Sequence, residues 1–184
     1  MGLKGAELDE KTIQFISDQK VFFVSTAPLA AEGHINCSPK GGVGTFAVLD
    51  PKTIAYLDLT GSGSETIAHI KENGRIVIMW CSFDEIPKVA RVHGTGKVFT
   101  IHDEEFVDYS KHFPVNVGAR SIVLVEVNRV STSCGYGVPR MDLIAERDDM
   151  QQWCDKKGPE GLIGYRQRKN ATSIDGLEAF VSLM

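Results

Sequence analysis

The sequence has no excess of positive charge and no long apolar segment. Its 184 residues include 20 lysines and arginines against 24 aspartates and glutamates, a formal net charge of −4. Nucleic acids and anionic membranes are bound through basic surfaces, so this balance argues against both as partners. No apolar run approaches the roughly 20 residues that cross a bilayer, and the polar stretch MGLKGAELDE is not a secretory signal. We therefore expect an intracellular, cytoplasmic protein, with a nuclear location left open.

Motifs for metal binding and for nucleophilic catalysis are also missing. The four cysteines (Cys37, Cys81, Cys134 and Cys154) form no C-x-x-C pair, and the histidines show neither H-x-x-x-H nor H-E-x-x-H spacing. Without such spacing we expect free thiols and no metal site. The chain also has no G-x-S-x-G elbow, which leaves a hydrolase without support.

The chain does have enough apolar sequence for one core. It is 42% hydrophobic and 24% charged, and its length suits a single domain over residues 1–184. Segments typical of strands follow one another with short helical interruptions. This order favours a mainly β fold, an antiparallel barrel with peripheral helices, over a doubly wound parallel sheet.

Hydrophobic periodicity places four helices and six strands along the chain. Helical spacing predicts helices over 8–18, 65–73, 103–112 and about 141–157. Runs rich in β-branched and aromatic residues predict strands over 21–28, 34–40, 53–58, 75–81, 88–100 and 121–130. We expect the barrel to occupy about residues 20–132, and a C-terminal helix and tail to occupy residues 140–184.

A run of small residues leads from one predicted strand into the helix that begins at Glu65. Free N–H groups at a helix N-terminus form an anion site when small residues allow close approach. The residues offered for this role are Thr60, Gly61, Ser62, Gly63, Ser64 and Thr66. The alternative is a plain helix cap with Ser64 as the N-cap residue, and the run taken alone favours that alternative. It is not a Walker loop, since no Gly-Lys-Ser/Thr follows.

Two cations and one loop are further candidates for a binding site. Lys40 follows a strand in SPKGG and is either a ligand-binding cation or an ordinary loop lysine. Arg91 interrupts an apolar strand and points either into a polar pocket or to solvent. In the loop CGYGVP, Gly135 precedes Tyr136, which either covers a ligand or packs into the core. Cys134 has no neighbouring base that would activate it as a nucleophile.

Four segments together resemble the pyridoxamine 5′-phosphate oxidase-like family of FMN-binding split barrels. They are VFFVSTAP, GHINCSPKGG, TIAYLDLTGSGSETIAHIKENGRIVIMWC and KVARVHGTGKV. The stretches SPKG, YLDLTGSGSETIAHI, CGYGVP and KNATSIDGL resemble a subgroup of that family without an assigned reaction. The resemblance covers most of the chain, from about Lys20 to Leu177.

The resemblance implies a six-stranded antiparallel split barrel that forms a homodimer and holds FMN between its subunits. Carried over by position, Asn36, Ser38 and Lys40 would lie along the flavin. The turn from Thr60 to Thr66 would meet the phosphate and the ribityl chain. Arg91 occupies the place of an arginine often found before the strand glycine in similar proteins. Further candidates, for the ring wall or the substrate, are Trp80, Cys134, Gly135 and Tyr136.

The sequence departs from the family pattern at the helix start. In pyridoxamine phosphate oxidases an Arg-Lys pair follows a serine there, whereas here Ser64 is followed by Glu65 and Thr66. The resemblance therefore implies an FMN-dependent oxidoreductase with an unspecified small-molecule substrate, rather than a true pyridoxamine phosphate oxidase. One alternative is a non-catalytic carrier of flavin, deazaflavin or haem, with an axial histidine chosen from His34, His69 and His93. Another is a cofactor-free structural dimer.

Overall fold

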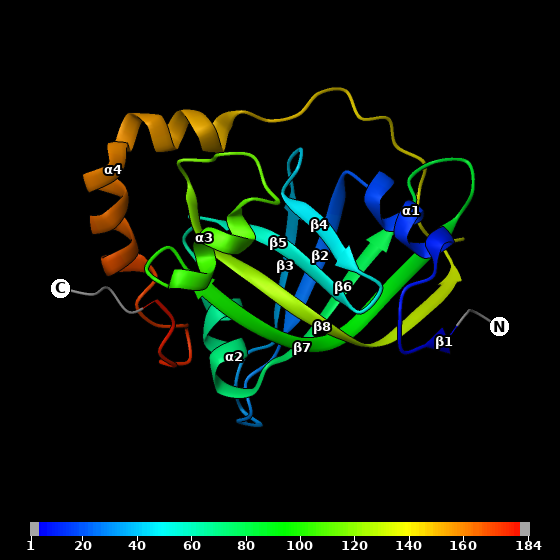
Figure 1. Ribbon diagram of the computed structural model, residues 1–184, viewed down its shortest axis with the longest axis horizontal. Helices are drawn as coiled ribbons and strands as arrows, with labels where there is room; N and C mark the ends of the chain where they lie inside the picture. Colours follow the sequence, from blue (N-terminus) through cyan, green and yellow to red (C-terminus); the bar gives the residue numbers. More distant parts are fainter. Residues whose placement is uncertain (1–3, 181–184) are drawn as a thin grey trace.

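The computed structural model describes residues 4–180 and contains one curled antiparallel sheet with helices around it (Figure 1). The strands are β1 (Lys4–Gly5), β2 (Val21–Thr26), β3 (Asn36–Gly41), β4 (Phe46–Asp50), β5 (Thr53–Leu59), β6 (Arg75–Cys81), β7 (Lys88–Thr100) and β8 (Ala119–Cys134). The helices are α1 (Glu10–Asp18), α2 (Glu65–Asn73), α3 (Glu104–Ser110) and α4 (Asp149–Lys169). None of the helices described is long and apolar enough to cross a bilayer.

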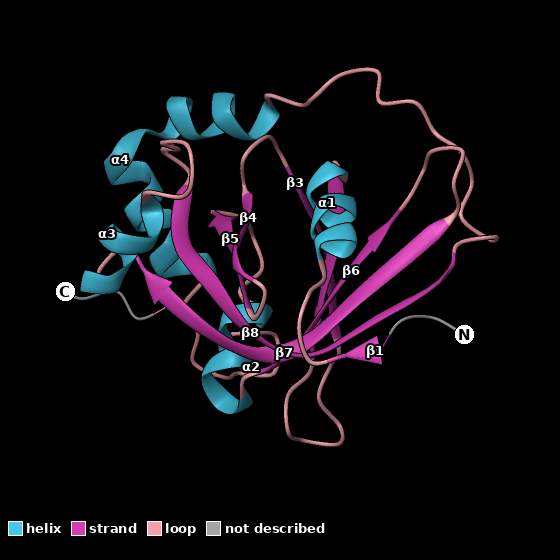
Figure 2. Ribbon diagram, turned by 45° about the vertical axis from the view of Figure 1, so that its right-hand side comes forward, coloured by secondary structure: helices cyan, strands magenta, loops and turns pink. Residues whose placement is uncertain are grey.

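The sheet has the order β3-β2-β6-β7-β8-β5-β4, with β1 paired to β8 off this path. The long strands β7 and β8 form its centre, and α3 and α4 gather at one end of this pair (Figures 1 and 2). The two edges, β3 and β4, are not paired to each other, so the curled sheet stays open between them. This arrangement confirms the predicted fold class, a mainly β split barrel with peripheral helices.

Alternation along the strands fills the interior of the curled sheet. In β2 every second residue from Phe22 is buried, and in β6 the same alternation buries Ile78 and Trp80. Each fully buried aliphatic or aromatic side chain of this kind contributes about 1.5–3 kcal/mol relative to exposure. The interior of the curled sheet is therefore a packed apolar core.

The sheet contains two strands beyond the six predicted, and the bounds predicted for the C-terminal helix were wrong. Strand β4 and the two-residue β1 were missed because both are short. The helix predicted over 141–157 begins at Asp149 instead and continues to Lys169. Residues 141–148 are all exposed, so no apolar face of a helix would be buried there. The segment is extended, and the N–H of Met141 donates to the carbonyl of Phe83.

Helix α2 begins where the open edge of the sheet exposes polar residues. It ends, as predicted, at Gly74, whose φ of 71° lies in the left-handed region that glycine adopts without strain. The N-cap position is Ser64, but its hydroxyl makes no capping bond to the helix. The first N–H groups of α2 are therefore not occupied by the side chain that the sequence offers as their cap.

Candidate functional site

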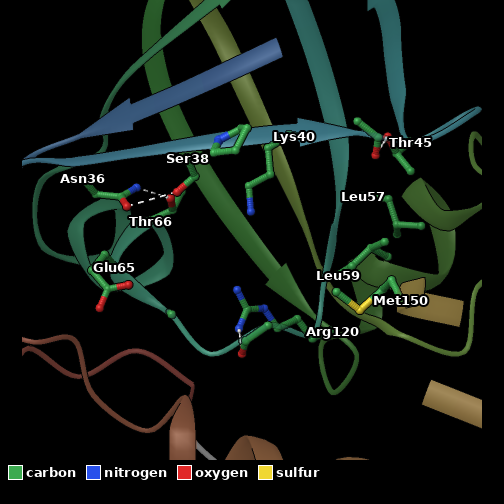
Figure 3. Close-up of a pocket in the computed structure, with 14 residues that line it drawn as sticks. Asn36, Ser38, Lys40, Thr45, Leu57, Leu59, Glu65, Thr66, Arg120 and Met150 are labelled. Atoms are coloured by element: carbon green, nitrogen blue, oxygen red, sulfur yellow. Dashed lines mark hydrogen bonds between the residues drawn. The ribbon is translucent and has the colours of Figure 1, made fainter. Parts of the chain in front are cut away.

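A polar pocket of about 340 Å³ lies at the open edge of the barrel (Figure 3). Strand β3 forms one wall, and the end of β5 together with the start of α2 forms the other. The lining residues are Asn36, Ser38, Pro39, Lys40, Gly41, Thr45, Leu57, Leu59, Gly61, Gly63, Glu65, Thr66, Arg120 and Met150. Six residues that the sequence singled out for cofactor binding are among them: Asn36, Ser38, Lys40, Gly61, Gly63 and Thr66.

Two cations in this pocket share one buried carboxylate. Lys40 extends from β3 toward Arg120 of β8 (Figure 3), and its Nζ lies 2.8 Å from Oδ1 of Asp58. The Nε of Arg120 lies 2.6 Å from Oδ2 of the same carboxylate. Asp58 belongs to β5, which pairs with β8 in the sheet but not with β3. The ion pair between Lys40 and Asp58 therefore joins the edge strand β3 to a strand with which it shares no backbone ladder.

Asp58 is ionised in this arrangement. Burial by itself would raise the pKa of its carboxyl, but Arg120 and then Lys40 hold that pKa well below its usual range. Two positive charges therefore surround one negative charge, and the cluster carries a net charge of about +1. An anion in the pocket would meet this uncompensated positive charge.

The start of α2 is joined to β3 by side-chain hydrogen bonds. The amide of Asn36 donates to Oγ1 of Thr66 at 2.9 Å, and the hydroxyl of Ser38 donates to Oδ1 of Asn36 at 3.0 Å. These bonds hold the first turn of α2 against the strand that carries Lys40. The N-terminus of the helix then lies beside the two cations, which favours an anion there.

Two of the hydroxyls expected to face a phosphate are engaged elsewhere. The hydroxyl of Thr60 donates to the carbonyl of Gly118 at 2.8 Å, and that of Ser64 donates to the carbonyl of Thr172 at 3.1 Å. Both side chains are buried and neither lines the pocket. Ser62 is exposed on the turn and does not line the pocket either.

The C-terminal segment forms side-chain hydrogen bonds that stabilise the turn before α2. The Nε of Arg166 donates to Oγ1 of Thr60 at 2.9 Å, and Nδ2 of Asn170 donates to the carbonyl of Gly61 at 2.8 Å. Both side chains are buried. Arg166 of α4 and Asn170, which follows the helix, therefore fix the position of the turn. Neither residue was singled out from the sequence for this role.

Arg91 lies outside the pocket, and so do the residues proposed for the ring wall or the substrate, which are Trp80, Cys134, Gly135 and Tyr136. Arg91 is directed to Ser133, whose Oγ lies 3.1 Å from its Nη1. Trp80 is fully buried in the aromatic core, where Phe46 packs against it at a centroid distance of 5.2 Å. Cys134 and Tyr136 are exposed, and the intervening Gly135 is packed against the backbone of Pro87 and Lys88, where β7 begins.

The three histidines considered as haem ligands occupy different environments. His69 is fully buried, and its Nδ1 lies 2.9 Å from Oγ1 of Thr26. His34 is exposed, and its Nδ1 lies 2.6 Å from a carboxylate oxygen of Asp175. His93 is exposed on β7. None of them lines the polar pocket, and residues 4–180 contain no cluster of three side chains suited to a metal ion.

Sequence reasoning missed Asp58 and Arg120, the two residues that organise the pocket's charge. A signal was present, because each interrupts a strand of otherwise apolar residues: TIAYLDL and ARSIVLV. A charged residue in such a strand is buried only when it is paired. Asp58 and Arg120, each in a strand expected to be buried, were therefore candidates for an ion pair between adjacent strands.

An antiparallel sheet that curls into a barrel, stays open between its edges β3 and β4 and carries helices around it is a split β-barrel. The family model for pyridoxamine 5′-phosphate oxidase matches residues 8–134. The pyridoxamine 5′-phosphate oxidase family protein ustO of Aspergillus flavus is 40% identical over 182 residues, which cover 90% of this chain and 73% of the relative. The chain belongs to the pyridoxamine 5′-phosphate oxidase family.

Solved structures share the fold at low sequence identity. HupZ from Group A Streptococcus matches with a TM-score of 0.52 and 21% identity, covering 67% of this chain and 91% of that one. A protein of Clostridium acetobutylicum related to general stress protein 26 matches with a TM-score of 0.51 and 12% identity, covering 69% and 91%. These similarities support the split-barrel fold.

Proposed function

We propose that the protein is an FMN-binding flavoprotein and an oxidoreductase acting on a small molecule. The observation that carries the proposal is the placement of Lys40 and Arg120 in one pocket, beside the N-terminal turn of α2. Membership in the pyridoxamine 5′-phosphate oxidase family supports a flavin as the ligand.

The phosphate of FMN is the group that this pocket would bind most strongly. It carries nearly two negative charges at neutral pH, and the cluster around Asp58 leaves about one positive charge uncompensated. The helix N-terminus adds a partial positive charge of about 0.5. Gly61 and Gly63 line the pocket, so a phosphate would approach the backbone N–H groups of the turn closely.

The rest of the lining is suited to the sugar chain and to one side of a flat ring. The linked polar side chains of Asn36, Ser38 and Thr66 would hydrogen-bond the ribityl hydroxyls, and Leu57 and Leu59 offer apolar contact.

A bound flavin supplies the electron transfer itself, and the protein orients the flavin and tunes its reactivity by hydrogen bonds. Among the described residues, those that line the pocket include no histidine or cysteine, so these residue types do not provide a nucleophile.

Pyridoxamine 5′-phosphate is not the substrate that we propose. Glu65 occupies the first helical position and lines the pocket, where its carboxylate offsets part of the positive charge that would hold the FMN phosphate and leaves no cation for a second phosphate. A substrate without a phosphate group meets no such penalty. We therefore propose a neutral or cationic small molecule as the substrate.

We also propose that the protein is a homodimer. The extended segment 141–148 presents large apolar side chains to solvent, among them Met141, Leu143 and Ile144, the last 97% exposed. Neighbouring exposed apolar residues of this kind are typical of protein interfaces. A second copy of the chain, covering this segment, would bury them.

A cytoplasmic location stays a prediction.

The cofactor proposal is tested by the visible absorbance of the purified protein, recorded before and after incubation with FMN and desalting. We expect retained flavin bands near one FMN per chain, and loss of most of this retention in Lys40→Gln. Lys97→Gln is the matched control, because Lys97 is exposed on β7 and lies outside the pocket. A colourless protein that retains no FMN would overturn the proposal, and a Soret band would replace flavin by haem.

A further inference from the structure

A second cavity of about 430 Å³ lies inside the bend of α4. It is separate from the polar pocket at the open edge and shares no lining residue with it. Its walls are mostly aliphatic, and they include Ile101, Val117, Leu162 and Ile163. Cavities of this size accommodate small organic molecules.

The bend that creates the cavity is built into the sequence. Gly158 has a φ of 65°, in the left-handed region that favours glycine, and Pro159 follows it inside α4. The two halves of the helix therefore meet at an angle, as the turn of α4 in Figure 1 shows. Both halves contribute to the lining, Cys154 from the first and Leu162 from the second.

Arg166 gives this aliphatic cavity a buried positive charge. The residue is only 5% exposed, and it lines the cavity. Its Nε donates to the hydroxyl oxygen of Thr60 and its Nη2 donates to the carbonyl of Ala119, each at 2.9 Å. Both acceptors are neutral. Within residues 4–180 no carboxylate lies within 4 Å of the Arg166 guanidinium, so its charge has no counterion there.

The charged groups near Arg166 within residues 4–180 do not pair with its guanidinium. Burial lowers the pKa of its guanidinium and the positive charge of Arg120 lowers it further, while Cys154 acts in the opposite direction. The acidic residue in the cavity lining, Asp155, is exposed and accepts a hydrogen bond from Gln151 rather than from Arg166. A buried cation without a partner is costly, and an anion that binds beside it removes this cost.

We propose that the cavity inside the bend of α4 binds a small aliphatic monocarboxylate. The carboxylate pairs with the guanidinium of Arg166 through the Nη donors that are not already bonded to Thr60 and Ala119. The alkyl chain lies against Ile101, Leu162 and Ile163 and is removed from water. The proposal does not rest on the identity of the ligand in the polar pocket, with which the cavity shares no lining residue.

The proposal is tested by isothermal titration of the full-length protein with hexanoate, with hexan-1-ol as the uncharged comparison. We expect saturable binding of hexanoate at one site per chain and binding of hexan-1-ol that is weaker by about tenfold or more, because only the acid forms the charged pair. Arg166→Gln is expected to raise the Kd for hexanoate by a similar factor. Arg168→Gln, an exposed arginine on the same helix, is the matched control and should leave the Kd unchanged.

A second variant keeps the test decisive if Arg166→Gln does not fold. Ile163 lines the cavity and is half exposed, so Ile163→Trp would fill the cavity without forcing a new side chain into the core. We expect this variant to lose hexanoate binding while Ile86→Trp, at an exposed position outside the cavity, retains it. The proposal is overturned if hexanoate shows no saturable binding, if hexan-1-ol binds equally well, or if Ile163→Trp still binds hexanoate.

Discussion

Lys40 and Arg120 bind opposite oxygens of one buried carboxylate, that of Asp58, at 2.8 and 2.6 Å. Lys40 comes from the edge strand β3, whereas Arg120 is the second residue of the central strand β8. The same contacts thus hold the open edge of the barrel together and leave positive charge in its pocket. Stability and ligand binding are coupled at Asp58, because the two cations that would attract an anion also stabilise the fold.

Replacing the shared carboxylate should destabilise the protein strongly. Asp58→Asn leaves the buried Arg120 and the partly buried Lys40 without their counterion, and breaking a buried ion pair on one side costs about 3–5 kcal/mol. We expect a corresponding fall in the free energy of unfolding, measured by urea denaturation at pH 7. Asp108→Asn is the control, since Asp108 pairs with Lys111 on the exposed surface. Equal stability of the Asp58→Asn variant and the native chain would contradict the structural role assigned to Asp58.

The fold was predictable because its signals are local, whereas the charge cluster was not. Alternation in VFFVST and the apolar run RIVIMWC each indicate a strand without knowledge of its neighbours. Asp58 and Arg120 are 62 residues apart, and they meet only because β5 pairs with β8. The sequence pattern does not specify which strands are neighbours, so this pair was missed.

The turn before α2 shows a second limit of sequence reasoning. Its position between strand and helix was predicted correctly, but the direction of each hydroxyl depends on distant residues. Thr60 is bonded to Gly118, and Ser64 is bonded to Thr172, which lies 108 residues further along the chain. The backbone N–H groups of the turn remain the part of the site that local sequence indicates.

The buried histidine of α2 should make the protein less stable in mild acid. Burial lowers the pKa of His69 in the folded state, outweighing the opposing effect of nearby acidic residues. As the pH falls below about 6.5, the unfolded chain takes up a proton at this residue before the folded chain does, so the free energy of unfolding decreases. We expect a lower urea midpoint at pH 5.5 than at pH 7.5.

His69→Gln should reduce this pH dependence, because glutamine still bonds to Thr26 but takes up no proton. His93→Gln is the matched control, since His93 is exposed on β7. An unchanged difference between the two pH values in His69→Gln would assign the acid sensitivity to other groups.

A single charge on the extended segment should dissociate the proposed dimer. Ile144→Glu places a carboxylate where a partner would bury an apolar side chain, and burying an unpaired charge costs several kcal/mol. Light scattering coupled to size-exclusion chromatography should give twice the chain mass for the native protein and the chain mass for Ile144→Glu. Ala31→Glu, on an exposed loop, should stay dimeric. A native protein that elutes at the mass of one chain would exclude the dimer.

The hydroxyls of Ser64 and Thr66, both at the start of α2, are expected to have different roles, the first in stability and the second in ligand binding. Ser64 is buried, and its hydroxyl is bonded to the carbonyl of Thr172, so Ser64→Ala should lower the free energy of unfolding by about 1 kcal/mol. Its Kd for FMN should stay within about twofold of the native value. Thr66 lines the pocket and accepts a hydrogen bond from Asn36, so Thr66→Val should weaken FMN by about fivefold or more.

Fluorescence titration of FMN, combined with urea denaturation of both variants, measures the two effects separately. If Ser64→Ala weakened FMN more than Thr66→Val did, the phosphate would contact the Ser64 hydroxyl directly, and the turn would have to rearrange on binding. The predicted order therefore tests whether the ligand meets the turn through its backbone N–H groups, with Thr66 and Asn36 fixing the helix against β3, or through the hydroxyls of the turn itself.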